Sequence, residues 1–88
     1  MDLPFNEDEQ ADAFFAALLT AVDEQLASKE TPYVAATHKR LLKAGLSDDE
    51  AREEIAKCLA EESDRMLRSG RPFDSRSYQE RLSSIETP

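Results

Sequence analysis

Glycine, cysteine and strand-forming patterns are scarce in this 88-residue chain. Its two glycines, Gly45 and Gly70, exclude the glycine-rich loops that cradle phosphates in nucleotide-binding proteins. Its single cysteine, Cys58, cannot form an internal disulfide and lacks the Cys-x-x-Cys spacing of zinc and redox sites. No alternating run of Val, Ile or Thr predicts a strand. These absences, with abundant Ala, Leu, Glu, Arg and Lys, predict an all-α fold.

A long hydrophobic run and a basic leader are also missing. No apolar stretch approaches the roughly 18 residues that a membrane-spanning helix needs. The first ten residues, MDLPFNEDEQ, have neither the basic nor the apolar region of a signal peptide. Together with the unpaired cysteine, these features predict a cytoplasmic protein with no membrane partner.

Positive charge is in short supply. The chain contains 11 Lys and Arg residues and 19 Asp and Glu residues, which gives a net charge of −8. Phosphate backbones repel such a surface, so we expect no nucleic-acid partner. The one basic cluster in the first seventy residues, Lys39, Arg40 and Lys43, is too small to reverse this expectation, but it could dock an acidic neighbour in this chain or in a second copy. An alternative is that the chain itself imitates nucleic acid and binds a basic protein.

Hydrophobic residues at helical spacing predict one domain, residues 1–88, that folds as a small bundle of three main helices and a short C-terminal helix. The predicted helices cover about 7–28, 32–44, 48–69 and a segment after residue 74. We expect residues 1–6 and 86–88 to fray. The short connections predict that consecutive helices are neighbours in space.

Helix boundaries explain the most unusual segment, AGLSDDE at residues 44–50. Gly45 is placed to end the second helix in a left-handed Schellman motif. Ser47 and Glu50 predict a capping box for the third helix. Thr31 and Pro32 similarly predict an N-cap and first residue for the second helix. We therefore interpret AGLSDDE as a helix joint and not as a cation-binding loop.

His38 is the only histidine, and it lies among apolar residues of the second predicted helix. It could be a metal ligand or a general base, or a partly buried side chain bonded to a neighbouring helix. The weak metal candidates beside it are Glu24, Asp49 and Glu53. Asp49 and Glu53 share a helical face, where paired carboxylates are usually solvated. No nucleophile–base pair or cofactor motif is present, so we expect no cofactor.

The first helix contains two adjacent bulky pairs, Phe14–Phe15 and Leu18–Leu19. They cover more than one helical face, so they form either a wide core face or a surface for a partner. Our first hypothesis is a non-catalytic interaction protein that self-associates or binds a partner helix through these residues. The alternatives are a metal-binding protein or metal-dependent enzyme that uses His38, and the acidic nucleic-acid mimic.

The order of three segments, AVDEQLA, TPYVAATHKRLLKAGLSDDEAREEIAKCLAEE and FDSRSYQERLSSI, resembles a family of small bacterial helical proteins, a domain of unknown function. The likeness covers roughly residues 16–85 and rests on Glu24, Gln25, Arg40, Leu41, Gly45, Glu50 and Ala51. The resemblance implies a helical fold. Some members carry histidines that suggest a metal site, and Asp49 and Glu53 stand where the third-helix histidines of that family fall.

Overall fold

The computed structural model describes the backbone of residues 7–87 and the side chains of residues 12–87. This part of the chain contains four α-helices and no strand: α1 (Glu7–Ala27), α2 (Pro32–Lys43), α3 (Asp48–Ser69) and α4 (Ser75–Ser83). The all-helical prediction is confirmed, and three longer helices with a short fourth are consistent with these bounds. The predicted fraying of residues 1–6 and 88 lies outside the described residues, whereas residues 86–87 follow α4 without helical structure.

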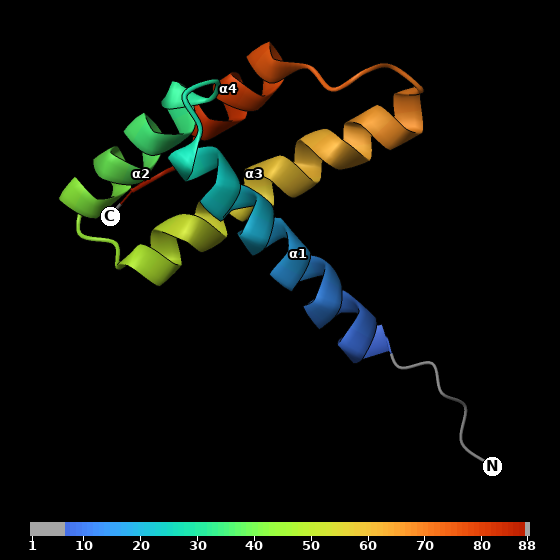
Figure 1. The fold of residues 1–88 in the computed structure, drawn as a ribbon, viewed down its shortest axis with the longest axis horizontal. Helices are drawn as coiled ribbons and strands as arrows, with labels where there is room; N and C mark the ends of the chain where they lie inside the picture. Colours follow the sequence, from blue (N-terminus) through green and yellow to red (C-terminus); the bar gives the residue numbers. More distant parts are fainter. Residues whose placement is uncertain (1–6, 88) are drawn as a thin grey trace.

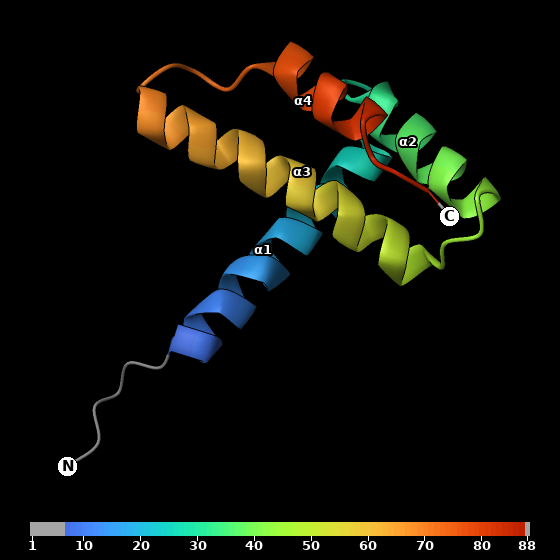
Figure 2. The same ribbon diagram turned by 180° about the vertical axis from the view of Figure 1, so that it is seen from behind.

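The helix α3 is the centre of the arrangement, because it contacts each of the other three helices. The helix α2 packs against both α1 and α4 (Figure 1). Figures 1 and 2 show α1 crossing α3, with the first half of α1 projecting away from the other helices. The two helices therefore diverge on one side of their crossing, and α2 lies on the other side.

Buried hydrophobic side chains from all four helices form one core: Leu18, Val22, Val34, Leu41, Ala51, Ile55, Ala56, Cys58, Leu59, Tyr78 and Leu82. Tyr78 is the bulkiest of the fully buried side chains. Its hydroxyl donates to Oε1 of Gln25 over 2.7 Å, which satisfies the polar end of a buried ring. The centroids of the Phe73 and Tyr78 rings lie 5.6 Å apart, edge to face, and make a hydrophobic contact around the start of α4.

The joint between α2 and α3 confirms the interpretation of AGLSDDE. Gly45 has a φ of 105°, a left-handed value that favours glycine. The Gly45 N–H donates to the carbonyl of Leu42, and the Leu46 N–H donates to the carbonyl of Leu41. These two hydrogen bonds together make a Schellman ending. Ser47 and Glu50 form both bonds of the capping box. These contacts assign a structural role to the acidic segment.

The start of α2 differs from the expectation in one respect. Thr31 stands at the N-cap and Pro32 follows it, but the Thr31 side chain makes no capping bond. Its hydroxyl instead donates to the carbonyl of Gln25 over 2.8 Å, near the end of α1. The Gln25 carbonyl lies in the last turn of α1, where it also accepts from the Ser28 N–H over 3.1 Å, so Thr31 adds a second donor to the end of the preceding helix. Asp74, in contrast, caps α4 with its side chain, which accepts from the N–H groups of the second and third helical residues.

Candidate functional site

The four bulky residues predicted as an interaction surface, Phe14, Phe15, Leu18 and Leu19, differ in how far they are exposed to solvent. Leu18 is only 8% exposed and belongs to the core. Phe15 and Leu19 are half-buried and pack against that core. Phe14 is 59% exposed, although it is adjacent to Phe15 in the sequence. Only Phe14 therefore offers most of its side chain to a partner.

Phe14 lines an apolar hollow of about 370 Å³ between α1 and α3. The remaining lining residues all come from α3: Ala60, Glu61, Ser63, Asp64 and Leu67. These lining residues belong to the first half of α1 and the second half of α3, the two halves that diverge from the crossing in Figure 1. Leu67 is 77% exposed, and sequence reasoning missed it because it lies off the core stripe of α3. An apolar residue on the polar face of an amphipathic helix was the available signal.

Two carboxylates, Glu61 and Asp64, line the rim of this hollow. The helix α1 contains six acidic residues and no Lys or Arg. On the α3 side, Asp64 pairs with Arg68 at 2.9 Å and Glu61 pairs with Arg81 at 3.0 Å, but both carboxylates are more than half exposed. Exposed ion pairs of this kind contribute little to stability. A partner with positive charges beside an apolar centre would suit this rim.

The three residues of the predicted basic cluster, Lys39, Arg40 and Lys43, have different surroundings. Arg40 donates from Nη2 to the carbonyl of Leu82 over 2.8 Å, at the end of α4, so it joins α2 to α4. Lys39 and Lys43 are exposed, and neither takes part in an ion pair among the side chains from residue 12 to 87. Between them stands Leu42, which is 41% exposed. The outer face of α2 therefore presents an apolar side chain flanked by two lysines.

His38 lies midway along α2, and its imidazole is 20% exposed. Its Nε2 is 2.8 Å from Oδ1 of Asp48, which agrees with a partly buried histidine bonded to a neighbouring helix. Among the described residues, no three His, Cys, Asp or Glu side chains are grouped to hold a metal ion. The structure thus does not bring His38 together with Glu24, Asp49 and Glu53 in such a group. The metal alternative stays a prediction that no observed cluster favours.

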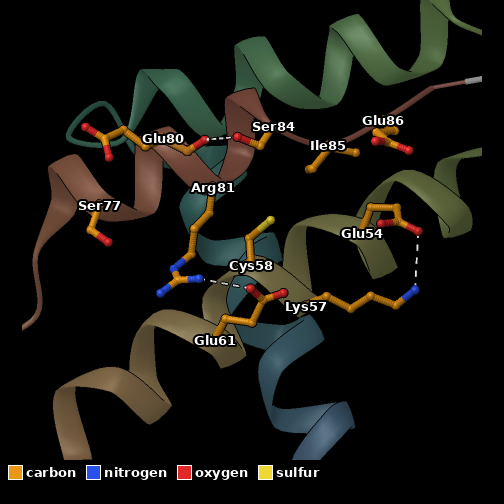
Figure 3. A pocket seen from close by; sticks show the side chains of 10 residues that line it. All are labelled: Glu54, Lys57, Cys58, Glu61, Ser77, Glu80, Arg81, Ser84, Ile85 and Glu86. Atoms are coloured by element: carbon orange, nitrogen blue, oxygen red, sulfur yellow. Dashed lines mark hydrogen bonds and ion pairs between the residues drawn. The ribbon is translucent and has the colours of Figure 1, made fainter. Parts of the chain in front are cut away.

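A second, more polar groove runs between α3 and α4, and Cys58 lies in its floor (Figure 3). Arg81 reaches across this groove from α4 to Glu61 on α3. Burial, with smaller contributions from Glu61 and Glu54, raises the pKa of the Cys58 thiol to about 11. The thiol is therefore protonated at neutral pH and is a poor nucleophile. Cys58 belongs to the core cluster, where it packs as a small buried hydrophobic side chain.

Glu62 occupies a core position of α3 and is fully buried. Its carboxylate accepts from Nε of Arg65 and from the hydroxyl of Ser77, both over 2.7 Å. It also accepts from the Asp74 N–H at 3.2 Å and from Nε of Arg81 at 3.4 Å. These bonds, that from Arg65 above all, lower its pKa to about 2 despite burial. The helical spacing of hydrophobic residues in α3 puts Glu62 on the inward side of the helix, but no local pattern indicates its partners on α4.

Within residues 7–87, none of the helices combines the length and the hydrophobicity that crossing a bilayer requires. Comparison with protein-family models, with curated proteins and with solved structures finds no match to this chain. The likeness to a family of small bacterial helical proteins stays a prediction.

Proposed function

We propose that this chain is a non-catalytic interaction protein that binds an amphipathic helical segment in the hollow between α1 and α3. One observation carries the proposal: Phe14, 59% exposed, and Leu67, 77% exposed, line a single apolar hollow from two different helices. Large apolar side chains that gather on a surface mark interaction sites more often than isolated ones do. Two diverging helices also make a groove into which the side-chain ridge of a third helix can pack.

The chemistry of the other candidate groups supports a binding role over a catalytic one. The Cys58 thiol is protonated at neutral pH. The His38 ring is bonded to Asp48, the first residue of α3, and so links α2 to α3. The Glu62 carboxylate is enclosed by donors from α3 and α4. Each of these groups has a structural role, whereas no structural role accounts for the exposure of Phe14 and Leu67.

The acidic rim defines the partner that this hollow would prefer. Glu61 and Asp64 border the apolar residues, and α1 adds no positive charge. A helix with an apolar ridge flanked by lysine or arginine would place unlike charges together around the contact. Such charges mainly increase the association rate and the selectivity, while the buried apolar area supplies the affinity.

The proposal can be tested by nuclear magnetic resonance with a designed helical peptide of Leu and Lys as the probe. We expect the backbone amide shifts that change on titration to cluster at residues 14, 60, 63 and 67. Phe14→Glu should abolish these changes, while Leu42→Glu, an exposed apolar residue outside the hollow, should preserve them. Equal binding by the Phe14→Glu variant would show that the hollow is not the binding site.

A further inference from the structure

A second exposed apolar side chain is complementary to the hollow, and it lies on α2 of the same chain. Leu42 is 41% exposed, with Lys39 and Lys43 beside it on the outer face of that helix. Ala35 and Ala36, both exposed, extend this face by one turn. The result is a small basic amphipathic surface, here called the α2 face: Ala35, Ala36, Lys39, Leu42 and Lys43. It has the chemistry that the proposed function requires of a partner.

The geometry prevents one copy from filling its own hollow. The diverging halves of α1 and α3 lie on one side of their crossing, and α2 lies on the other side (Figures 1 and 2). Both surfaces are therefore available at once, one as acceptor and one as ligand. A contact between two different surfaces of identical chains is heterologous, so it continues into a ring or a linear chain of copies.

Charge also discriminates between possible arrangements of two copies. A two-fold contact of α1 against α1 would bring together two helices that each hold six acidic residues and no cation. Like charges placed in this way oppose association. Docking of the α2 face into the hollow instead places Lys39 and Lys43 near Glu61 and Asp64, whose carboxylates stay more than half exposed although each also pairs with an arginine.

We infer that the occupant of the hollow is the α2 face of a second copy of this chain, joined head to tail. This inference rests on the proposed function, because it names the partner of the same hollow. The apolar centres are small, so the association is reversible and depends on concentration. It should also weaken as salt screens the lysine–carboxylate attraction across the contact.

A mixing experiment with two variants tests this arrangement. Phe14→Glu disables the hollow but keeps the α2 face, and Leu42→Glu disables the α2 face but keeps the hollow. In light scattering at rising concentration, we expect the wild-type mass to grow beyond that of a dimer and each variant alone to stay monomeric. An equimolar mixture of the variants should form a two-chain complex and nothing larger, because only one competent pair of surfaces remains.

Charge reversal gives a second variant that does not depend on an apolar residue. Lys39→Glu with Lys43→Glu should prevent self-association as Leu42→Glu does, whereas Lys57→Glu, an exposed lysine on α3, should have no effect. Circular dichroism and urea unfolding check that every variant keeps the fold.

Two results would overturn the inference. If the wild type stays monomeric at all concentrations, the second copy is not the occupant of the hollow. Binding of the Leu–Lys peptide at Phe14 would then still support the proposed function. If the wild type neither self-associates nor binds the peptide, both the inference and the proposed function are refuted. If the wild type associates but the mixed variants do not, the interface uses other surfaces.

Discussion

The hydroxyl of Ser77 on α4 donates to Oε1 of Glu62 on α3 over 2.7 Å, fifteen residues away in the sequence. The same carboxylate accepts from the Asp74 N–H at the start of α4 and from Arg65 one turn later on α3. One buried anion thus fastens the last helix to the central helix, and α4 in turn contributes Tyr78 and Leu82 to the core.

Replacing Glu62 should therefore destabilise the protein. We expect Glu62→Gln to lower the free energy of unfolding by about 2 kcal/mol, because it leaves the guanidinium of Arg65 without a charged acceptor in a partly buried site. The partners Arg65 and Arg81 keep about a third of their side chains exposed, so water limits the loss. Urea unfolding measures the change. Glu61→Gln is the matched control, since Glu61 is 59% exposed and its pair with Arg81 contributes little. Equal losses in the two variants would contradict this role of Glu62.

The same carboxylate predicts a dependence of stability on pH. Its pKa is about 2 in the folded protein against an ordinary value of 4.5, so the unfolded chain binds more protons between these values. Its contribution is complete above about pH 4.5 and is lost as the pH falls towards 2. We expect the difference in unfolding free energy between wild type and Glu62→Gln to shrink across this window.

Measuring a difference between two variants removes the contributions of other carboxylates. Glu50 is one of these, since its bonds to Ser47 also lower its pKa. Urea unfolding at several pH values gives the comparison. A difference that stays constant down to the lowest pH would show that Glu62 titrates normally in the folded state.

Truncation to alanine should destabilise the protein at Leu18 but have little effect on stability at Phe14. Leu18→Ala removes a core side chain and should cost about 2–3 kcal/mol of stability. Phe14→Ala removes a side chain that is mostly solvated, and its effect on stability should stay within about 0.5 kcal/mol. Thermal or urea unfolding followed by circular dichroism compares the two. A large loss for Phe14→Ala would place Phe14 in the fold and weaken the case for an interaction surface.

The buried thiol gives a simple test of the groove between α3 and α4. Cys58 has a pKa of about 11 and is 6% exposed. A disulfide reagent should therefore label it slowly at neutral pH and rapidly once urea unfolds the chain. The same reagent on the unfolded chain is the internal control. Rapid labelling without denaturant would mean that α4 opens easily from α3.

Arg40 and Lys39 are adjacent residues with different expected roles. Arg40→Gln loses the hydrogen bond to the carbonyl of Leu82 and should cost about 1 kcal/mol of stability. Lys39→Gln, which removes the same charge from an exposed side chain, should leave stability within about 0.5 kcal/mol. Urea unfolding distinguishes them. Similar losses in both variants would mean that Arg40 is not needed to hold the end of α4.

Local contacts explain why much of the fold could be predicted. The Schellman ending at Gly45, the capping box of Ser47 and Glu50, and the Asp74 cap all join residues within a few positions of one another. Such contacts depend on side-chain chemistry and helical spacing, and both can be read from the amino-acid sequence. The inward stripe of α3 follows from the same spacing, including the position of Glu62.

The sequence by itself thus determined the helices, their ends and the residues able to form a core. Only the tertiary structure decided which of the neighbours Phe14 and Phe15 is exposed, because the crossing of α1 and α3 covers one side of α1 and leaves the other open. It also decided that Leu67 lines the same hollow as Phe14 and that Arg40 donates a hydrogen bond to the end of α4. These relationships join helices distant in the chain, and their geometry depends on helix crossings that no local pattern encodes.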